Sequence, residues 1–402
     1  MQTGPFDALP ASPFARLRRL LEPLTPPAGE TVSLALGEPQ HAPPGFAMEA
    51  LRHAAAADYG RYPPIGGTDE WQKAARHWLT ERFALSAGLL AEETQVLPLS
   101  GTREGLFLAA QLAPQKSDGL MAMPNPFYQV YASAAVAAGA TPVYLDAPQE
   151  AGFLPDLGAL SADVLTRLRA LYLCSPANPQ GAIASEAYLQ SAYQLAKQHD
   201  FLLLVDECYS EIYDAAPPPS MLQIIDAAQD ADAPVLVFHS LSKRSNLAGL
   251  RSGLVTGGRS AIAAFHKLRM VAGPQTPLPS LQAAALAWAD TAHVADNRAL
   301  YRRKIDLAEQ IFADSYGFYR PEGGFFLWLR VGDGEKAAAH LWRHAGLRVL
   351  PGAYLTQDTA AGNIGAPYIR VALVAGLEDL QAALPRLKQA LDEGGFADEA
   401  AA

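Results

Sequence analysis

The sequence predicts an α/β protein in which a large sheet domain of seven strands, with helices on both faces, is joined to a smaller α+β domain. Three observations lead to this fold class. Short β-rich segments alternate with helical patterns between about residues 95 and 257. After about residue 279 the order of elements changes, beginning with a long helical stretch. Finally, a chain of 402 residues favours more than one domain, because a single hydrophobic core rarely grows so large.

Seven segments have the composition and length of strands, and they define the large sheet. In residues 171–174, 201–205 and 235–238 the apolar side chains run without alternation, which is expected of central strands covered on both faces. The predicted strands lie at residues 95–99, 119–123, 142–146, 170–174, 201–206, 235–239 and 252–256.

Helical patterns connect these strands, so the crossover connections are predicted to be helices. Thr102 and Ser185 are candidate N-caps, because a hydroxyl oxygen can accept a hydrogen bond from a backbone N–H of the first turn. The predicted crossover helices lie at residues 103–112, 127–138 and 187–198. The second domain is predicted to contain a long helical stretch through residue 313, an apolar segment at 325–330, a helix near 335–345, and strands near 347–350 and 368–373.

We divide the chain into an N-terminal arm over residues 1–40 that joins the small domain, a large domain over residues 41–285, and a small C-terminal domain over residues 286–402. The first 24 residues lack the continuous apolar segment of a secretory signal. The longest apolar stretches, such as residues 201–205, are far shorter than the roughly 18–20 residues that span a bilayer. No membrane segment is therefore predicted.

The net charge indicates which binding partners the protein excludes, and the cysteine content indicates its cellular compartment. The formal net charge of −10 argues against nucleic acids and anionic membranes, because both repel an acidic protein that has no segregated basic patch. The two cysteines, Cys174 and Cys208, each lie in an apolar strand-like segment, which argues against a disulfide framework. A reducing compartment, the cytoplasm, is expected.

The strongest local motif is Ser240-Leu241-Ser242-Lys243, directly after a predicted strand. A lysine at the end of such a strand faces the cleft in which open α/β sheets bind ligands, and desolvation lowers its pKa toward the amine form that a Schiff base requires. The two serines, with Arg251 eight positions further on, can hold a phosphate. Taken alone, Lys243 and Arg251 fit solvated loop residues better, but the neighbouring motifs reverse that interpretation.

Two polar residues follow buried strands of the predicted sheet. Asp206 ends the apolar segment 201–205, and a buried carboxylate there requires a cation, such as a protonated pyridine nitrogen, with Tyr209 in reach of the neighbouring ring oxygen. Asn178 follows another strand and can donate a hydrogen bond to an anionic ring oxygen. The alternatives are a helix cap for Asp206 and a simple Asn-Pro turn for Asn178.

Three further segments complete the candidate site. Gly101 and Thr102 join a strand to a helix, where free backbone amides bind phosphate, and Arg103 follows them. Tyr128 can stack on a planar cofactor, although an aromatic residue there is more often part of the core. Arg370 interrupts a strand-like segment, where its guanidinium suits two-point binding of a carboxylate, and an outward-facing strand residue is an equally good interpretation.

In this order the motifs resemble those of the fold type I aminotransferases over residues 30–375, nearly the whole chain. The shared features are the Asn-Pro turn, Asp-x-x-Tyr, Ser-x-Ser-Lys, Gly-x-Arg-x-Gly and a late arginine. The resemblance implies a mostly parallel seven-stranded sheet, pyridoxal 5'-phosphate as cofactor, and no metal ion. It also implies a homodimer with shared active sites, because Tyr62 resembles the tyrosine that family members contribute to the neighbouring subunit's phosphate site.

The resemblance assigns roles to the residues that face the cofactor ring. Lys243 binds the cofactor covalently and acts as the catalytic base, while Asp206 pairs with the pyridinium nitrogen. Asn178 and Tyr209 address the phenolic oxygen, and Tyr128 stacks on the ring.

The same resemblance assigns the substrate and phosphate contacts. The backbone of Gly37 and the guanidinium of Arg370, with Asn178 beside them, receive the substrate α-carboxylate. The residues implied to hold the phosphate are Gly101, Thr102, Ser240, Ser242 and Arg251, next to Arg103.

Several segments are closer still to the succinyldiaminopimelate aminotransferases of lysine biosynthesis, of the proteobacterial type. The implied reaction is transamination between N-succinyl-L,L-2,6-diaminopimelate and 2-oxoglutarate. One departure is Gln180, where the family's turn usually has threonine. The segments that carry this likeness are residues 36–41, 101–104, 124–131, 206–213 and 240–246.

Other functions remain open at this point. An aspartate or aromatic aminotransferase, or a C–S β-lyase, would use the same cofactor site. A cofactor-binding regulator would need a DNA-binding module, for which the roughly 30 residues before the fold leave no room. Arg103 and Arg244 adjoin the predicted site, and either can pair with a distal carboxylate of a dicarboxylic substrate or remain a solvated charge.

Overall fold

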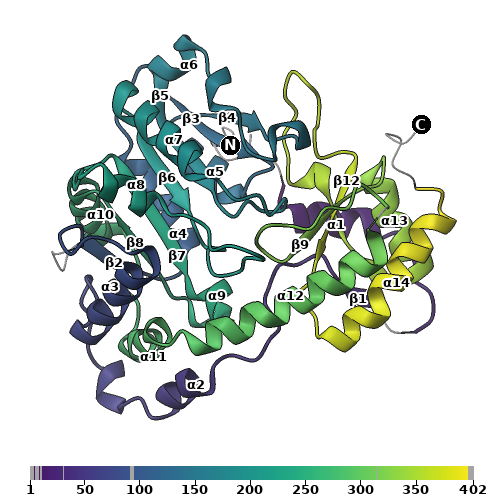
Figure 1. Ribbon diagram of the computed structural model, residues 1–402, viewed down its shortest axis with the longest axis horizontal. Coiled ribbons are helices and arrows are strands. Elements are labelled where there is room, and N and C mark those ends of the chain that lie inside the picture. Colours follow the sequence, from purple (N-terminus) through teal and green to yellow (C-terminus); the bar gives the residue numbers. More distant parts are fainter. Residues whose placement is uncertain are drawn as a thin grey trace.

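The computed structural model describes residues 4, 9, 11–29, 31–90, 95–313 and 315–396. Its elements form a large sheet flanked by helices and a smaller sheet on the other side of the molecule, joined by one long helix (Figure 1). The predicted N-terminal arm and C-terminal domain therefore extend in part over residues that lie outside the described ranges.

The large sheet has seven strands in the order β2-β8-β7-β6-β5-β3-β4. Strand β8 is antiparallel to both of its neighbours, whereas the pairs from β7 to β4 are parallel, which confirms the predicted α/β class. The strands are β2 (Val96–Leu99), β3 (Leu120–Asn125), β4 (Thr141–Asp146), β5 (Leu168–Cys174), β6 (Leu202–Asp206), β7 (Val235–Ser240) and β8 (Gly253–Gly257).

Two hydrophobic cores sandwich this sheet, which explains the unbroken apolar runs of its central strands. In β6, Leu203 and Val205 belong to one core, while Leu202 and Leu204 belong to the other. The first core is completed by α3 (Asp69–Phe83), α7 (Glu186–His199), α8 (Met221–Ala227) and α11 (Leu278–Ala289). The second is completed by α4 (Thr102–Ala109), α5 (Gln129–Ala137) and α10 (Arg259–Ala272).

A second, three-stranded antiparallel sheet has the order β11-β12-β9. The N-terminal part of the chain joins it, because β1 pairs with β10 and α1 packs against α13. The elements are α1 (Pro13–Leu21), β1 (Val32–Ser33), β9 (Phe326–Arg330), α13 (Gly334–Ala345), β10 (Leu347–Arg348), β11 (Leu350–Pro351), β12 (Tyr368–Ala372) and α14 (Leu377–Glu393).

Two helix boundaries differ from the prediction. Ser185 caps α7 as predicted, but the N-cap of α4 is Gly101, and Thr102 is its first helical residue. The predicted helical stretch from residue 279 to 313 is broken into α11 and α12 (Ala292–Phe312). The break occurs because the Asp290 carboxylate accepts the backbone N–H of His293 at 3.0 Å and so caps a new turn.

Three smaller points complete the fold. Helices α2 (Gly45–Arg52) and α6 (Ala162–Arg167) lie outside the sequence-based assignments, as do α3, α8, α10 and α14. The proposed domain boundary at residue 285 falls within α11. The division of the chain into domains stays a prediction. Among the described residues, no helix is both long and apolar enough to cross a bilayer.

Candidate active site

A cleft of about 1260 Å³ opens beside the carboxyl ends of β5, β6 and β7, the edge at which open α/β sheets bind ligands. It brings together most of the residues singled out in the sequence. The predicted residues that line it are Gly37, Thr102, Arg103, Tyr128, Asn178, Asp206, Tyr209, Ser240, Ser242, Lys243, Arg251 and Arg370.

Lys243 lies in α9 (Leu241–Arg244), the single helical turn that follows β7. Its ammonium donates to the backbone oxygen of Gly37, and it lies 5.3 Å from the centre of the Phe325 ring. Burial lowers the pKa of Lys243 to about 8, because removing the ammonium from water disfavours its charge. A larger fraction of this lysine is therefore the nucleophilic amine at neutral pH than of an ordinary lysine.

Asp206 is the last residue of β6, and its carboxylate is buried beside the cleft. Tyr131 donates its hydroxyl to Oδ2 at 2.8 Å, and the backbone N–H of Cys208 donates to Oδ1 at 3.2 Å. Burial raises the pKa of Asp206, whereas these hydrogen bonds oppose that rise. The carboxylate is thus held by neutral donors, and no ion pair within the described residues uses its charge.

Arg370, Asn178 and Tyr209 form a hydrogen-bonded chain across the cleft. Arg370 Nη1 donates to Asn178 Oδ1 at 3.2 Å, and Asn178 Nδ2 donates to the Tyr209 hydroxyl at 3.4 Å. A second nitrogen of Arg370 donates to the backbone oxygen of Ala35 at 2.7 Å, and burial lowers the pKa of this guanidinium to about 10. Among the described residues no carboxylate pairs with Arg370, so a buried cation remains for an anionic ligand.

The loop into α4 and the turn of α9 form a cradle for an anion. Gly101 has φ +85, and an added Cβ would lie 2.0 Å from the guanidinium of Arg251, so only glycine allows this approach. Ser240 Oγ accepts the backbone N–H of Ser242 at 3.1 Å, which orders the second half of the cradle. Hydroxyls, a guanidinium and the free amides of the α4 N-terminus, beginning at Thr102, thus converge as a phosphate requires.

Tyr128 and Arg103 come from the N-terminal ends of α5 and α4, and together they form one wall of the cleft. Arg103 Nε donates to the Tyr128 hydroxyl at 2.5 Å, and its guanidinium carbon is 5.6 Å from the ring centre. This bond orients the Tyr128 ring, which lines the cleft as the stacking role requires.

Two predicted residues lie elsewhere. Gly101 is behind the cradle, in contact with Arg251, and does not itself line the cleft. Tyr62 is 96% exposed and outside the cleft of its own chain, so its predicted contact with a neighbouring subunit is not tested within one chain.

The position of Arg244 contradicts the hypothesis that this residue pairs with a distal substrate carboxylate. Its side chain is buried on the far side of the sheet, 5.1 Å from the ring centre of Trp78 and 5.2 Å from that of Trp288. The guanidinium donates to backbone oxygens at the end of α11, among them that of Asp290 at 3.1 Å. It therefore cannot reach a substrate carboxylate, and the idea that Arg244 binds one is wrong.

Tyr131, Phe326 and Glu38 are among the cleft residues to which the sequence motifs assigned no role. Tyr131 holds Asp206, and Phe326 packs under Arg370 with the guanidinium carbon 4.3 Å from its ring centre. Glu38 adds the carboxylate next to Gly37. Tyr131 had a detectable signal, because it follows Tyr128 by three residues and so lies one helical turn further along the same wall.

Comparison with known proteins decides the family. The model of the family described as aminotransferase class I and II matches residues 30–384.

The chain belongs to this family.

Related aminotransferases cover nearly the same length. A 4-dedimethylamino-4-oxo-anhydrotetracycline transaminase of Streptomyces rimosus is 34% identical over 359 residues, 89% of this chain and 92% of the relative. An LL-diaminopimelate aminotransferase of Dehalococcoides mccartyi is 30% identical over 389 residues, 95% of this chain and 96% of that one. The crystal structure of an aminotransferase from Neisseria meningitidis has a TM-score of 0.90 at 34% identity, covering 97% of this chain and 99% of the other.

Aminotransferases of this family depend on pyridoxal 5'-phosphate, and the cleft fits that cofactor. The cradle around Arg251 suits a phosphate, and the buried carboxylate of Asp206 suits a protonated ring nitrogen. The amine of Lys243 lies in the same cleft, as covalent attachment to an aldehyde requires.

Proposed function

We propose that this aminotransferase moves an amino group from an amino acid to 2-oxoglutarate, with Lys243 as the residue that transfers the proton. The observation that carries the proposal is the placement of Lys243, an amine with a lowered pKa, in one cleft with Asp206 and Arg370. Bound pyridoxal phosphate supplies an electron sink for the bond that breaks at the substrate Cα. The protein supplies the groups that bind, orient and exchange protons.

Each residue has a distinct task in this proposal. Asp206 keeps a proton on the ring nitrogen by ion pairing, and Tyr131 keeps Asp206 oriented. Arg370 and the backbone N–H of Gly37 hold the α-carboxylate, which directs the Cα–H bond toward Lys243. The ammonium already contacts the backbone oxygen of Gly37, so the proton donor and the carboxylate site are adjacent.

We propose N-succinyl-L,L-2,6-diaminopimelate as the amino donor. The segments at residues 36–41, 124–131 and 240–246 support this, as they resemble succinyldiaminopimelate aminotransferases. A 30% identical relative that is an LL-diaminopimelate aminotransferase supports the diaminopimelate skeleton. Within the cleft, Arg103 is the cation left for a distal carboxylate once Lys243, Arg251 and Arg370 have their tasks.

The experiment is a coupled assay of the cofactor-loaded enzyme with 2-oxoglutarate as acceptor. Succinylated diaminopimelate, free LL-diaminopimelate, aspartate, tyrosine and cystathionine are compared as donors by kcat/KM. We expect the succinylated donor to be preferred by at least about tenfold, about 1.4 kcal/mol in transition-state binding. Preference for another donor keeps the transamination and refutes the substrate, while release of pyruvate and ammonia without a 2-oxo acid establishes a β-lyase.

Arg103→Gln tests the distal contact in the same assay. The variant should lose about tenfold in kcat/KM for the succinylated donor and little for tyrosine, since only the former has a distal carboxylate. An equal loss for both donors would mean that Arg103 acts only by orienting Tyr128.

We also propose a homodimer in which Tyr62 reaches the partner's phosphate cradle. The ring of Tyr62 is 96% exposed and that of nearby Tyr59 is 70% exposed, which is unusual for aromatic side chains. Light scattering should give twice the mass of 42.8 kDa, and Tyr62→Phe should weaken cofactor binding without changing that mass. A monomer, or unchanged cofactor affinity, would contradict the shared site.

A further inference from the structure

Two buried titratable side chains lie directly behind the site and have no part in the proposed chemistry. Glu207 follows Asp206, and His239 precedes Ser240; they are 1% and 2% exposed. Their backbones are linked through β6 and β7, since the N–H of Glu207 donates to the oxygen of Phe238 at 3.0 Å. Glu207 Oε2 and His239 Nε2 lie 3.4 Å apart.

The two oxygens of Glu207 have different surroundings. Oε1 accepts the backbone N–H of Met221 at 2.9 Å, and the Ser220 hydroxyl also bonds to this carboxyl group. Oε2 of Glu207 and Nε2 of His239 have no other hydrogen-bond partner among the described residues. Two orphaned acceptors facing each other in a dry interior are costly, and one proton between them satisfies both.

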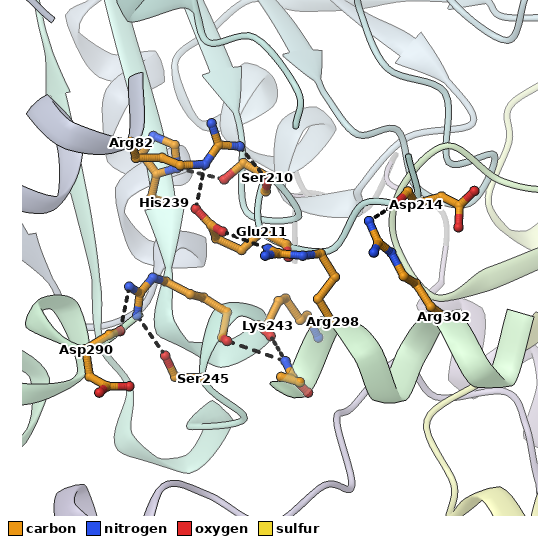
Figure 2. A network of polar contacts seen from close by, with 12 residues as sticks. Arg82, Ser210, Glu211, Asp214, His239, Lys243, Ser245, Asp290, Arg298 and Arg302 are labelled. Carbon is orange, nitrogen blue, oxygen red and sulfur yellow. Dashed lines mark hydrogen bonds and ion pairs between the residues drawn. The ribbon is translucent and has the colours of Figure 1, made fainter. Parts of the chain in front are cut away.

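Charged groups on neighbouring elements also act on the protonation of the two residues. Arg82 of α3 and Arg244 of α9 face His239, and both oppose a positive imidazolium. Glu207 faces Arg82, which favours its ionised form, and Asp206, which opposes it. Arg82 is already paired with Glu211 at 2.9 Å. Figure 2 shows this pair beside His239.

Burial is the largest influence on both residues. It lowers the pKa of His239 to about 3 and raises the pKa of Glu207 to about 7. Both directions favour neutral forms, so an imidazolium–carboxylate ion pair is disfavoured and the proton belongs to the glutamic acid. The other ring nitrogen of His239 then carries its own proton and faces Ser210 Oγ at 3.4 Å.

We propose that Glu207 is a carboxylic acid whose Oε2–H donates to His239 Nε2, and that this neutral pair positions the active site from behind the sheet. It links the residue after Asp206 to the residue before Ser240, and so holds the ring-nitrogen partner in register with the phosphate cradle and Lys243. It also keeps a second negative charge away from Asp206, so the ionised carboxylate is the one that faces the cleft. The positioning role rests on the proposed cofactor chemistry, whereas the proton assignment does not.

Glu207→Gln tests the proton assignment, because an amide reproduces a neutral acid: its NH₂ donates to Nε2 and its oxygen accepts from Met221. We expect Glu207→Gln to bind pyridoxal phosphate within about twofold of the wild type, whereas Glu207→Leu weakens binding at least about tenfold. Cofactor binding by Glu207→Gln that is weakened as much as in Glu207→Leu would overturn the proton assignment.

Glu211→Gln is the matched control. Glu211 is also buried, but it accepts from Arg82 at 2.9 Å and Arg298 at 3.3 Å, so it is an ionised carboxylate between two guanidiniums. The same substitution four residues away should therefore lower the melting temperature clearly, while Glu207→Gln at pH 7 does not. Equal effects of the two substitutions would refute the distinction between a protonated and an ionised glutamate.

The pH dependence of stability supplies a second readout, independent of activity. Because burial raises the Glu207 pKa from the ordinary 4.5 to about 7, its contribution is fully present below pH 4.5 and is lost as pH rises through about 7. Glu207→Gln lacks this loss, so its stability relative to the wild type should improve between pH 5 and 7 and then level off.

Infrared spectroscopy completes the test. The wild type should show the carbonyl band of a protonated carboxyl group at pH 6 that is missing in Glu207→Gln and present in Glu211→Gln. A stability difference that does not vary with pH, together with no such band, overturns the proton assignment. Normal cofactor binding in a folded Glu207→Leu variant overturns the positioning role alone.

Discussion

At the ends of β6 and β7, charged residues that are adjacent in the sequence have different surroundings on the two sides of the sheet. Asp206 and Lys243 face the cleft, whereas their sequence neighbours Glu207 and Arg244 lie behind the sheet. In the cleft, Asp206 and Lys243 are held by neutral hydrogen-bond partners, the Tyr131 hydroxyl for Asp206 and the Gly37 oxygen for Lys243. A bound ligand can therefore supply the opposite charges that pair with these two side chains.

Behind the sheet, Arg244 and Glu211 have partners within the protein. Arg244 donates to three backbone oxygens at the end of α11, where the helix dipole is negative. Glu211 lies between two arginines, and Glu207 is best described as neutral. The difference lies in the carboxylates: Asp206, which faces the cleft, is held by a neutral hydroxyl, whereas Glu211 behind the sheet is neutralised by two arginines.

The largest expected effect is the loss of turnover in Lys243→Ala, which removes the amine that faces the cleft. Turnover should fall by more than about 10⁴-fold, because covalent attachment and proton transfer are both lost and no other lysine lines the cleft within the described residues. The characteristic absorbance of the lysine-bound cofactor should disappear, while the melting temperature of the apoprotein stays near the wild type. Residual turnover near the wild-type level would place the reactive amine elsewhere.

Arg244→Met should have the opposite signature. It leaves three carbonyl oxygens of α11 without their donor between Trp78 and Trp288, so we expect a loss of about 3 kcal/mol in the free energy of unfolding. Denaturant unfolding measures the loss, and the KM of the folded variant for dicarboxylic donors should be unchanged. A selective rise in that KM would restore Arg244 as a substrate residue.

Arg370→Lys keeps the charge and removes the planar fork. The expected cost is about 2 kcal/mol in binding the α-carboxylate, which raises KM about 30-fold. Titration of the variant with amino-acid and amine donors separates the causes, because a donor without an α-carboxylate should not respond. An equal loss for both kinds of donor would show that the substitution disturbs Asn178 instead.

The smallest expected effect is on Tyr131→Phe. It removes one hydrogen bond to the Asp206 carboxylate, about 1.5 kcal/mol, which corresponds to a roughly tenfold weaker affinity for pyridoxal phosphate. Loss of that bond also lets the pKa of Asp206 rise further, so binding should weaken most at acidic pH. Titration of the apoenzyme with cofactor at pH 6 and pH 8 measures both effects, and equal losses at the two pH values would contradict the electrostatic part.

Much of this comparison could be predicted from the sequence because the ends of buried parallel strands carry its motifs. The apolar run before Asp206 and the strand before Ser240 placed both residues at one edge of the sheet. The predictions were wrong where the direction of a side chain, and not its position in the sequence, decides what it contacts. Arg244 adjoins Lys243 in sequence, but one step along a helical turn rotates the side chain by about 100° and sends it behind the sheet.

Long-range packing accounts for the other differences from prediction. Nothing local indicates that Tyr131 meets a carboxylate 75 residues away, although its spacing from Tyr128 places it on the same wall. The break at Asp290 depends on a side chain that competes with the helix, and helical periodicity alone continues through it. Tyr62 stays a prediction, because its expected partner belongs to another subunit.

Helix α12 has a mechanical consequence for any enzyme of this design. Near its start, the amide of Asn297 donates to the backbone oxygens of Lys243 and Arg244 at 3.3 and 3.4 Å. About two turns further on, Lys304 donates to the backbone oxygens of Leu373 and Val374, just after β12, which carries Arg370. The helix behaves as a stiff rod of about 31 Å between the two sheets (Figure 1). Any rotation of the smaller sheet when Arg370 binds a carboxylate must therefore either bend α12 or displace the backbone at Lys243.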